Sequence, residues 1–164
     1  MYENTLTANL SSIIKQSPHA VSQINGSDEY PDIYGKVRLY QTNLGVLVCA
    51  EIIGLPSPSE KCKNPIFGFH IHGGSSCNES ENDPFPSAMA HYDTQNCPHP
   101  YHAGDLPPLF GNNGYAFLAF ITNRFSVGEV IGKTFIIHSA PDDFTTQPAG
   151  NSGERIACGI IQKA

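Results

Sequence analysis

The sequence predicts an all-β domain with long loops that carry a metal site, and three observations support this class. Charged residues make up only 15% of the 164 residues, and 15 glycines with 13 prolines favour many turns over long helices. Apolar residues alternate with polar ones in several short segments, as they do in half-buried strands. Six of the seven histidines gather in a few short segments. Neutral imidazole is the commonest metal ligand, and a His/Asp cluster suits zinc or copper.

One helix is expected, before the strands. Within residues 5–15 the apolar residues follow the spacing of an amphipathic helix, and Pro18 ends it. These apolar residues are Leu6, Leu10, Ile13 and Ile14. We therefore interpret residues 1–18 as a helical extension that docks on the barrel or on a partner subunit, and residues 19–164 as the β domain.

Seven later segments have strand patterns, and loops separate them. The expected strands are 20–25, 36–41, 46–54, 66–72, 115–122, 133–138 and 155–161. A short turn is expected at Ser126, because Ser126 and Glu129 have the spacing of a capping box. The loops 73–90, 91–108 and 139–153 are long for a compact domain, and such loops are usually functional or disordered.

Charge and composition exclude several classes. The formal net charge of −6 argues against a nucleic-acid or anionic-membrane partner, and no apolar run is long enough to span a bilayer. The N-terminus lacks a basic region followed by an apolar stretch, so a cytoplasmic location is expected. The alternative is an extracellular or cell-envelope protein whose leader has been removed. Five cysteines are too few to define a disulfide scaffold.

Alternation along a strand places His70 and His72 on one face and Phe69 and Ile71 on the other. If Phe69 and Ile71 face the core, the two imidazoles lie outside the sheet, under loops, where they can bind one ion. The same alternation places His138 on the outer side of its own strand. A single pair of this kind is a weak signal, because most such pairs are polar surface positions.

The loop after this strand carries a denser ligand pattern. His99, His102 and Asp105 lie at intervals of three residues and could form three corners of a tetrahedral zinc site. The alternative is a solvated polar loop. His91 could complete one site or link two, and the thiol of Cys97 remains open as a ligand or as a disulfide partner.

With these residues in view, the chain resembles the copper/zinc superoxide dismutases of bacterial type, with shortened zinc and electrostatic loops. The matching segments, within residues 19–162, are 68–72, 91, 104–107, 130–138, 142–143 and 150–159. The resemblance implies an eight-stranded Greek-key β-barrel, an immunoglobulin-like sandwich, with the metals outside its wall. It also implies disproportionation of superoxide to oxygen and hydrogen peroxide by Cu(II)/Cu(I) cycling beside a structural zinc.

The resemblance further implies particular residue roles. Copper is expected at His70, His72, His91 and His138, and zinc at His91, His99, His102 and Asp105. His91 would bridge the two ions and deliver a proton, and Arg155 would attract and orient superoxide. Asp142 would tie a copper histidine to a zinc histidine, here His70 and His99.

The cysteines divide into three groups. By the resemblance, Cys77 and Cys158 form the intrasubunit disulfide that fastens the loop after His72 to the last strand. A second disulfide between Cys62 and Cys97 is a hypothesis, because their segments are expected to be neighbours. Cys49 alternates outward from its apolar neighbours and is expected to be a free thiol.

Some positions depart from the family pattern. The loop 139–153 carries no lysine, so electrostatic attraction of the anion is expected to depend on Arg155 alone, with Asp142 and Asp143 opposing it. Ala149 occupies a position where threonine is frequent, and Glu154 places an acidic group next to Arg155.

The sequence supports two other functional classes less well than a dismutase. A metal-binding or chaperone-like module with this fold usually lacks a copper ligand or the arginine, and neither is missing here. A zinc hydrolase needs an open zinc position with a general base, whereas this zinc set is full. Beyond superoxide, a homodimer and a copper-delivery protein remain open as partners.

Overall fold

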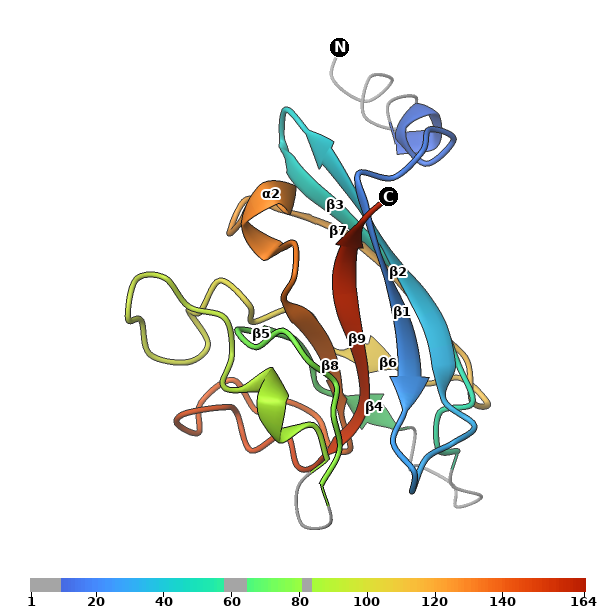
Figure 1. Cartoon of the computed structure of the whole chain (residues 1–164), viewed down its shortest axis with the longest axis vertical. Helices are drawn as coiled ribbons and strands as arrows, with labels where there is room; N and C mark the ends of the chain where they lie inside the picture. The colour runs from blue at the N-terminus through green and yellow to red at the C-terminus, as the bar shows by residue number, and fades with distance from the viewer. Residues whose placement is uncertain (1–9, 58–64, 81–83) are drawn as a thin grey trace.

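The computed structural model describes residues 10–57, 65–80 and 84–164, and these residues form a β-barrel (Figure 1). One antiparallel sheet has seven strands in the order β5-β8-β9-β1-β2-β3-β7, and a second pairs β4 with β6. The strands are β1 Ala20–Gly26, β2 Tyr34–Thr42, β3 Gly45–Ile53, β4 Ile66–Phe67, β5 Phe69–His72, β6 Leu109–Phe110, β7 Ala116–Thr122, β8 Thr134–His138 and β9 Arg155–Lys163. The predicted all-β class is confirmed.

The strand order has Greek-key connectivity. Strands β1, β2 and β3 form a meander, after which the chain crosses to β5 at the opposite edge of the same sheet and then returns as β7 beside β3. Strand β9 pairs with both β8 and β1, so the last strand of the chain lies beside the first. The sheet curls around a core of inward-facing residues, for example the paired Val37 and Ala50 and the paired Leu39 and Val48.

The segment 66–72 was predicted as one strand, but it forms two, β4 and β5, that separate at Gly68. The backbone N–H of Gly68 donates to the carbonyl of Ala140, outside either ladder. A Cβ at this position would lie 2.9 Å from the Cβ of Ser152, which leaves no room for a side chain. If β4 and β5 are counted together, the described residues contain the eight strands expected of the barrel.

The N-terminal segment packs on the outside of the barrel. Residues 10–13 are helical, and the first half of the predicted helix 5–15 lies outside the described residues. Ile13 packs against the outer cluster of Tyr40, Leu47 and Cys49 on β2 and β3. Docking against the barrel is therefore what the structure shows, and Cys49 is a buried free thiol on the outward face of β3.

The described part of the chain has two short helical elements besides this segment. The 3₁₀ turn η1 spans Pro86–Ala88, and α2 spans Val127–Val130. The capping box predicted at the start of α2 is present: the Glu129 carboxylate accepts bonds of 2.6 Å from the N–H and from the hydroxyl of Ser126. Among the described helices, none has the length and apolar character needed to cross a bilayer.

Candidate metal centre

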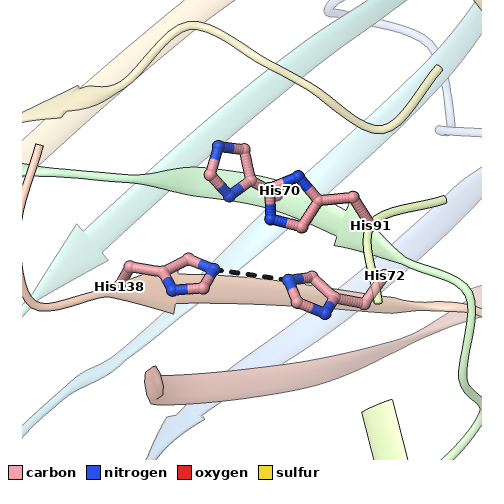
Figure 2. Close-up of side chains that lie close together, drawn as sticks. All are labelled: His70, His72, His91 and His138. Atoms are coloured by element: carbon pink, nitrogen blue, oxygen red, sulfur yellow. Dashed lines mark hydrogen bonds between the residues drawn. The ribbon is translucent and has the colours of Figure 1, made fainter. Parts of the chain in front are cut away.

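Strands β5 and β8 supply three histidines to the outer surface of the barrel wall. Phe69 and Ile71 are fully buried in the barrel core, as the alternation predicts. His70 and His72 point to the opposite side, and His138 at the end of β8 joins them (Figure 2). These imidazoles are also buried, because the loops 73–108 and 139–154 cover this face of β5 and β8 (Figure 1).

The loop 73–108 adds its ligands by pairing with β5. His91 forms an isolated bridge opposite His72, and Asp105 forms another opposite His70. The Ile71 N–H donates to the Gly104 carbonyl at 2.9 Å, and the Ile71 carbonyl accepts from Tyr92 N–H at 2.8 Å. A Cβ at Gly104 would collide with the Ile71 carbonyl oxygen, so only glycine allows this close approach.

The first cluster contains His70, His72, His91 and His138, whose ligand nitrogens all lie within 4.8 Å of one another. Figure 2 shows the four rings converging from β5, β8 and the loop that carries His91. The Nε2 atoms of His72 and His138 are 3.3 Å apart, and the rings of His70 and His91 have centroids 4.0 Å apart. Four converging imidazoles are a donor set suited to copper.

The second cluster contains His91, His99, His102 and Asp105, again with ligand atoms within 4.8 Å of one another. The Asp105 carboxylate is central to it: Oδ1 lies 2.7 Å from His91 Nδ1, and Oδ2 lies 3.1 Å from His102 Nδ1. Three imidazoles and one carboxylate match a four-coordinate zinc site. The two clusters share His91.

Unpartnered nitrogens show that both donor sets fit a metal ion. His70 Nδ1, His91 Nε2 and His99 Nδ1 are buried, and none has a hydrogen-bond partner among the described groups. His99 Nδ1 lies 3.2 Å from Asp105 Oδ2, but that approach lacks hydrogen-bond geometry. A buried unsatisfied polar atom costs about 1–3 kcal/mol, and a bound cation would supply the missing partner.

In four of the histidines, one ring nitrogen faces an oxygen acceptor of the protein. Asp142 accepts from two of them, with His70 Nε2 at 2.8 Å and His99 Nε2 at 2.9 Å. His72 Nδ1 lies 2.8 Å from the Met89 carbonyl, and His138 Nδ1 lies 3.2 Å from the Gly153 carbonyl. Because these carbonyl and carboxylate oxygens accept an N–H, they leave the opposite nitrogen unprotonated and free to bind a metal.

Burial and neighbouring groups together set the protonation states that metal binding requires. Burial is the main cause that lowers the pKa of His138 to about 3, and it also holds the pKa of His72 well below its ordinary value. Burial alone would raise the pKa of Asp105, but its hydrogen bond with His91 and the nearby imidazoles lower it to about 2. At neutral pH the imidazoles of His72 and His138 are therefore neutral and the Asp105 carboxyl is ionised, as metal ligands must be.

Arg155 lies at the edge of the first cluster. Its Nη1 donates to the Phe85 carbonyl and its Nη2 to the Met89 carbonyl, both at 2.7 Å. The Met89 carbonyl also faces His72 Nδ1, so one backbone oxygen links the arginine to a histidine of the cluster. After burial and the neighbouring histidines, the charge of Arg155 also lowers the pKa of His72.

The predicted disulfide between Cys77 and Cys158 is formed, and it fastens the loop 73–90 to β9 beside Arg155. The second predicted disulfide remains a prediction, because Cys62 lies outside the described residues; Cys97 is half-buried in the loop. Asp142 is buried between its two histidines, whereas Asp143 is exposed.

The remaining positions singled out in the loop 139–154 lie on its surface. Ala149 is half-buried and Glu154 is exposed. Two side chains that the sequence analysis did not single out, Arg124 and Gln147, hydrogen-bond to the backbone of the zinc cluster. No spacing rule marks them, because both act across long sequence separations.

Comparison with known proteins identifies the family of this chain. Residues 33–161 match the family model described as copper/zinc superoxide dismutase (SODC). A Superoxide dismutase [Cu-Zn] 2 of Aquifex aeolicus is 33% identical over 146 residues, which cover 80% of each chain. The Superoxide dismutase [Cu-Zn] of Escherichia coli is 35% identical over 142 residues, which cover 78% of each.

A solved structure agrees with these relatives. The crystal structure of a double mutant of a SOD-like protein from Bacillus subtilis has a TM-score of 0.71 and 27% sequence identity. The match covers 88% of this chain and 97% of that one. Together with the two histidine clusters that meet at His91, these matches show that the chain belongs to the copper/zinc superoxide dismutase family.

Proposed function

We propose that this chain disproportionates superoxide with copper held by the first cluster and zinc by the second. The observation that carries the assignment is the position of His91, which belongs to both clusters. Its Nδ1 faces Asp105 of the second cluster at 2.7 Å, while its buried Nε2 has no partner among the described groups and is left for the first cluster. One imidazole can therefore contact two ions.

The overall reaction converts two superoxide anions and two protons into one molecule of oxygen and one of hydrogen peroxide. When bound, copper supplies one-electron redox chemistry between Cu(II) and Cu(I), and zinc supplies a fixed positive charge on the far side of His91. The protein has to attract the anion, orient it and provide protons.

His91 is the proposed proton carrier. Its Nε2 is buried without a protein partner, so a proton placed there makes no competing hydrogen bond with the described residues. Its Nδ1 lies 2.7 Å from Asp105 Oδ1, and a zinc ion held by these two groups would keep the ring in place whether or not Nε2 carries a proton. His91 can thus hold one proton at Nε2 and release it to the reduced product, and the second proton comes from solvent.

Arg155 is the proposed anion-binding residue. Two of its five N–H donors are used by the carbonyls of Phe85 and Met89, which fix the guanidinium beside His72. The other donors and the full positive charge remain available for an anion. A fixed guanidinium can orient a small anion by directed hydrogen bonds, which a mobile surface cation cannot do.

Superoxide consumption by the metal-loaded protein tests this proposal. We expect Arg155→Ala to lower kcat/KM by about tenfold or more, because it removes the charge that attracts the anion and the donors that orient it. Arg38→Ala is the matched control, since Arg38 is a half-buried arginine on β2 that pairs with Glu51 at 3.7 Å.

Two results of this assay would contradict the proposal. If the wild type, shown by metal analysis to carry both ions, consumes no superoxide, the chain is a metal-binding module. If Arg155→Ala and Arg38→Ala have the same rate, Arg155 has no special role in attracting the anion.

Glu154 is expected to oppose this attraction. It is exposed and adjacent to Arg155, and the loop 139–153 contains no lysine or arginine that would offset its charge. We expect Glu154→Gln to raise kcat/KM about twofold at low ionic strength and to lose this advantage near 1 M salt, where charges are screened beyond about 3 Å. Rates measured over a salt series check this; a gain that persists at high salt would contradict an electrostatic cause.

A further inference from the structure

The zinc-cluster segment 99–105 is held in place by two side chains that come from other parts of the chain. The first is Gln147, in the loop 139–153. Its Oε1 accepts a 3.0 Å hydrogen bond from the backbone N–H of His99, and its Nε2 donates to the His99 carbonyl at 2.6 Å. Gln147 thus makes the pair of bonds that a neighbouring strand would otherwise make with this residue.

The second side chain is Arg124, which lies between β7 and α2. Its Nη1 faces three backbone carbonyls of the same segment: Pro100 at 3.1 Å, His102 at 3.0 Å and Asp105 at 3.1 Å. Three carbonyls around one nitrogen form a converging cluster of negative dipoles, and the guanidinium charge offsets it. Arg124 therefore fixes how sharply this segment turns.

These contacts reach every ligand that the segment supplies. Gln147 holds the backbone of His99, and Arg124 holds the carbonyls of His102 and Asp105. The segment itself contains no strand or helix. Its own backbone contacts are few: the Tyr101 N–H donates to the Pro98 carbonyl at 2.9 Å, the Asp105 N–H donates to the His102 carbonyl at 3.2 Å, and Gly104 pairs with Ile71. A short, irregular segment must lose much backbone entropy to present three ligands. Because contacts from other parts of the chain already order the segment, less of that entropy has to be lost when the metal binds.

We infer that Arg124 and Gln147 are positioning residues for the second cluster, which preset its ligands before a metal arrives. The inference rests on the proposed zinc site. Neither side chain belongs to a ligand set, so each acts through the backbone that it holds. Residues that orient metal ligands typically contribute about 10- to 100-fold in affinity. Both are largely exposed residues, so the lower end, about tenfold each, is the expected effect.

Cobalt binding provides a readout other than activity. The first cluster is loaded with Cu(I), which is colourless, and the protein is titrated with Co(II) against a chelator without oxygen. Absorption bands of tetrahedral Co(II) then report the geometry of the second cluster, and the competition reports its affinity. Arg124→Met and Gln147→Met are expected to bind Co(II) about tenfold more weakly and to shift these bands.

Two further variants separate positioning from general stability. Because all three bonds of Arg124 meet at one nitrogen, the ammonium of Arg124→Lys, with three donors, should recover part of the affinity and move the bands back toward the wild type. Arg38→Met, which removes a half-buried arginine from β2, should leave affinity and spectrum unchanged.

Each remaining outcome has a definite meaning. If Arg124→Met and Gln147→Met bind Co(II) with the affinity and spectrum of the wild type, the positioning role is wrong and the zinc site stands. If the wild type shows no tetrahedral Co(II) bands, or if these bands persist in His102→Ala, the assignment of the second cluster is wrong.

Discussion

Replacing Asp142 by asparagine is expected to weaken binding of at least one of the two metals by about 10- to 100-fold. Asp142 is buried and joins the two clusters, with one carboxylate oxygen 2.8 Å from His70 Nε2 and the other 2.9 Å from His99 Nε2. Burial alone would raise the pKa of this carboxyl, but the hydrogen bonds from His70, from Phe144 N–H and from His99 lower it, so both oxygens accept.

An asparagine at this position can satisfy only one of the two rings. Its carbonyl oxygen can replace one carboxylate oxygen, but its NH₂ group meets the N–H of the other histidine, so two donors face each other. That imidazole must then turn away or move its proton to Nδ1, the nitrogen proposed to bind the metal. In either case, one cluster loses a histidine that is oriented and deprotonated for metal binding.

Metal content after dialysis against a graded chelator series measures the effect of Asp142→Asn. The matched control is Asp143→Asn, because Asp143 is the adjacent carboxylate but is exposed and bonds only within its own loop, to Thr145 and Thr146. This control should keep both metals. Equal retention of copper and zinc by the two variants would show that Asp142 does not orient the ligands.

Loss of the disulfide between Cys77 and Cys158 is expected to have the largest effect on stability. The two cysteines are separated by 81 positions, so the bond closes a long loop. In the chain-entropy account such a crosslink contributes about 2–4 kcal/mol to the free energy of unfolding, with long loops at the upper end. Cys77→Ala should therefore lower the midpoint of denaturant unfolding markedly.

This disulfide should also affect turnover. It fastens the loop 73–90, whose Phe85 and Met89 carbonyls hold Arg155. Cys77→Ala should lower kcat/KM in addition to stability, and reductant should reproduce both effects in the wild type while leaving the variant unchanged. Unfolding curves of the oxidised and reduced wild type that coincide would contradict the structural role of the bond.

Much of the barrel could be predicted from local patterns. Alternating apolar residues located the central strands, because one side chain in two faces the core: Val37 and Leu39 on β2 pack against β3 as expected. The same alternation placed His70 and His72 outside the wall. It failed for β6, since Leu109–Phe110 is too short to show any period, and at Gly68, whose backbone N–H bonds to the Ala140 carbonyl outside either ladder.

The parts of the site that sequence reasoning missed depend on distant contacts. Arg124 lies 22 residues from His102, and Gln147 lies 48 residues from His99. Nothing near either residue in sequence marks it as a partner of the zinc segment. The carbonyl of Met89 is a similar case: a backbone oxygen carries no residue-type signal, yet it contacts both His72 and Arg155.

The central claim is that one imidazole joins two metal ions, and a crystal structure of the protein grown with copper and zinc tests it most directly. Anomalous diffraction on either side of each absorption edge would place each element separately. The account predicts copper at Nε2 of His91 and zinc at Nδ1, each about 2.0–2.1 Å from its nitrogen. Two fully occupied ions with His91 bound to only one of them, or to neither, would contradict it.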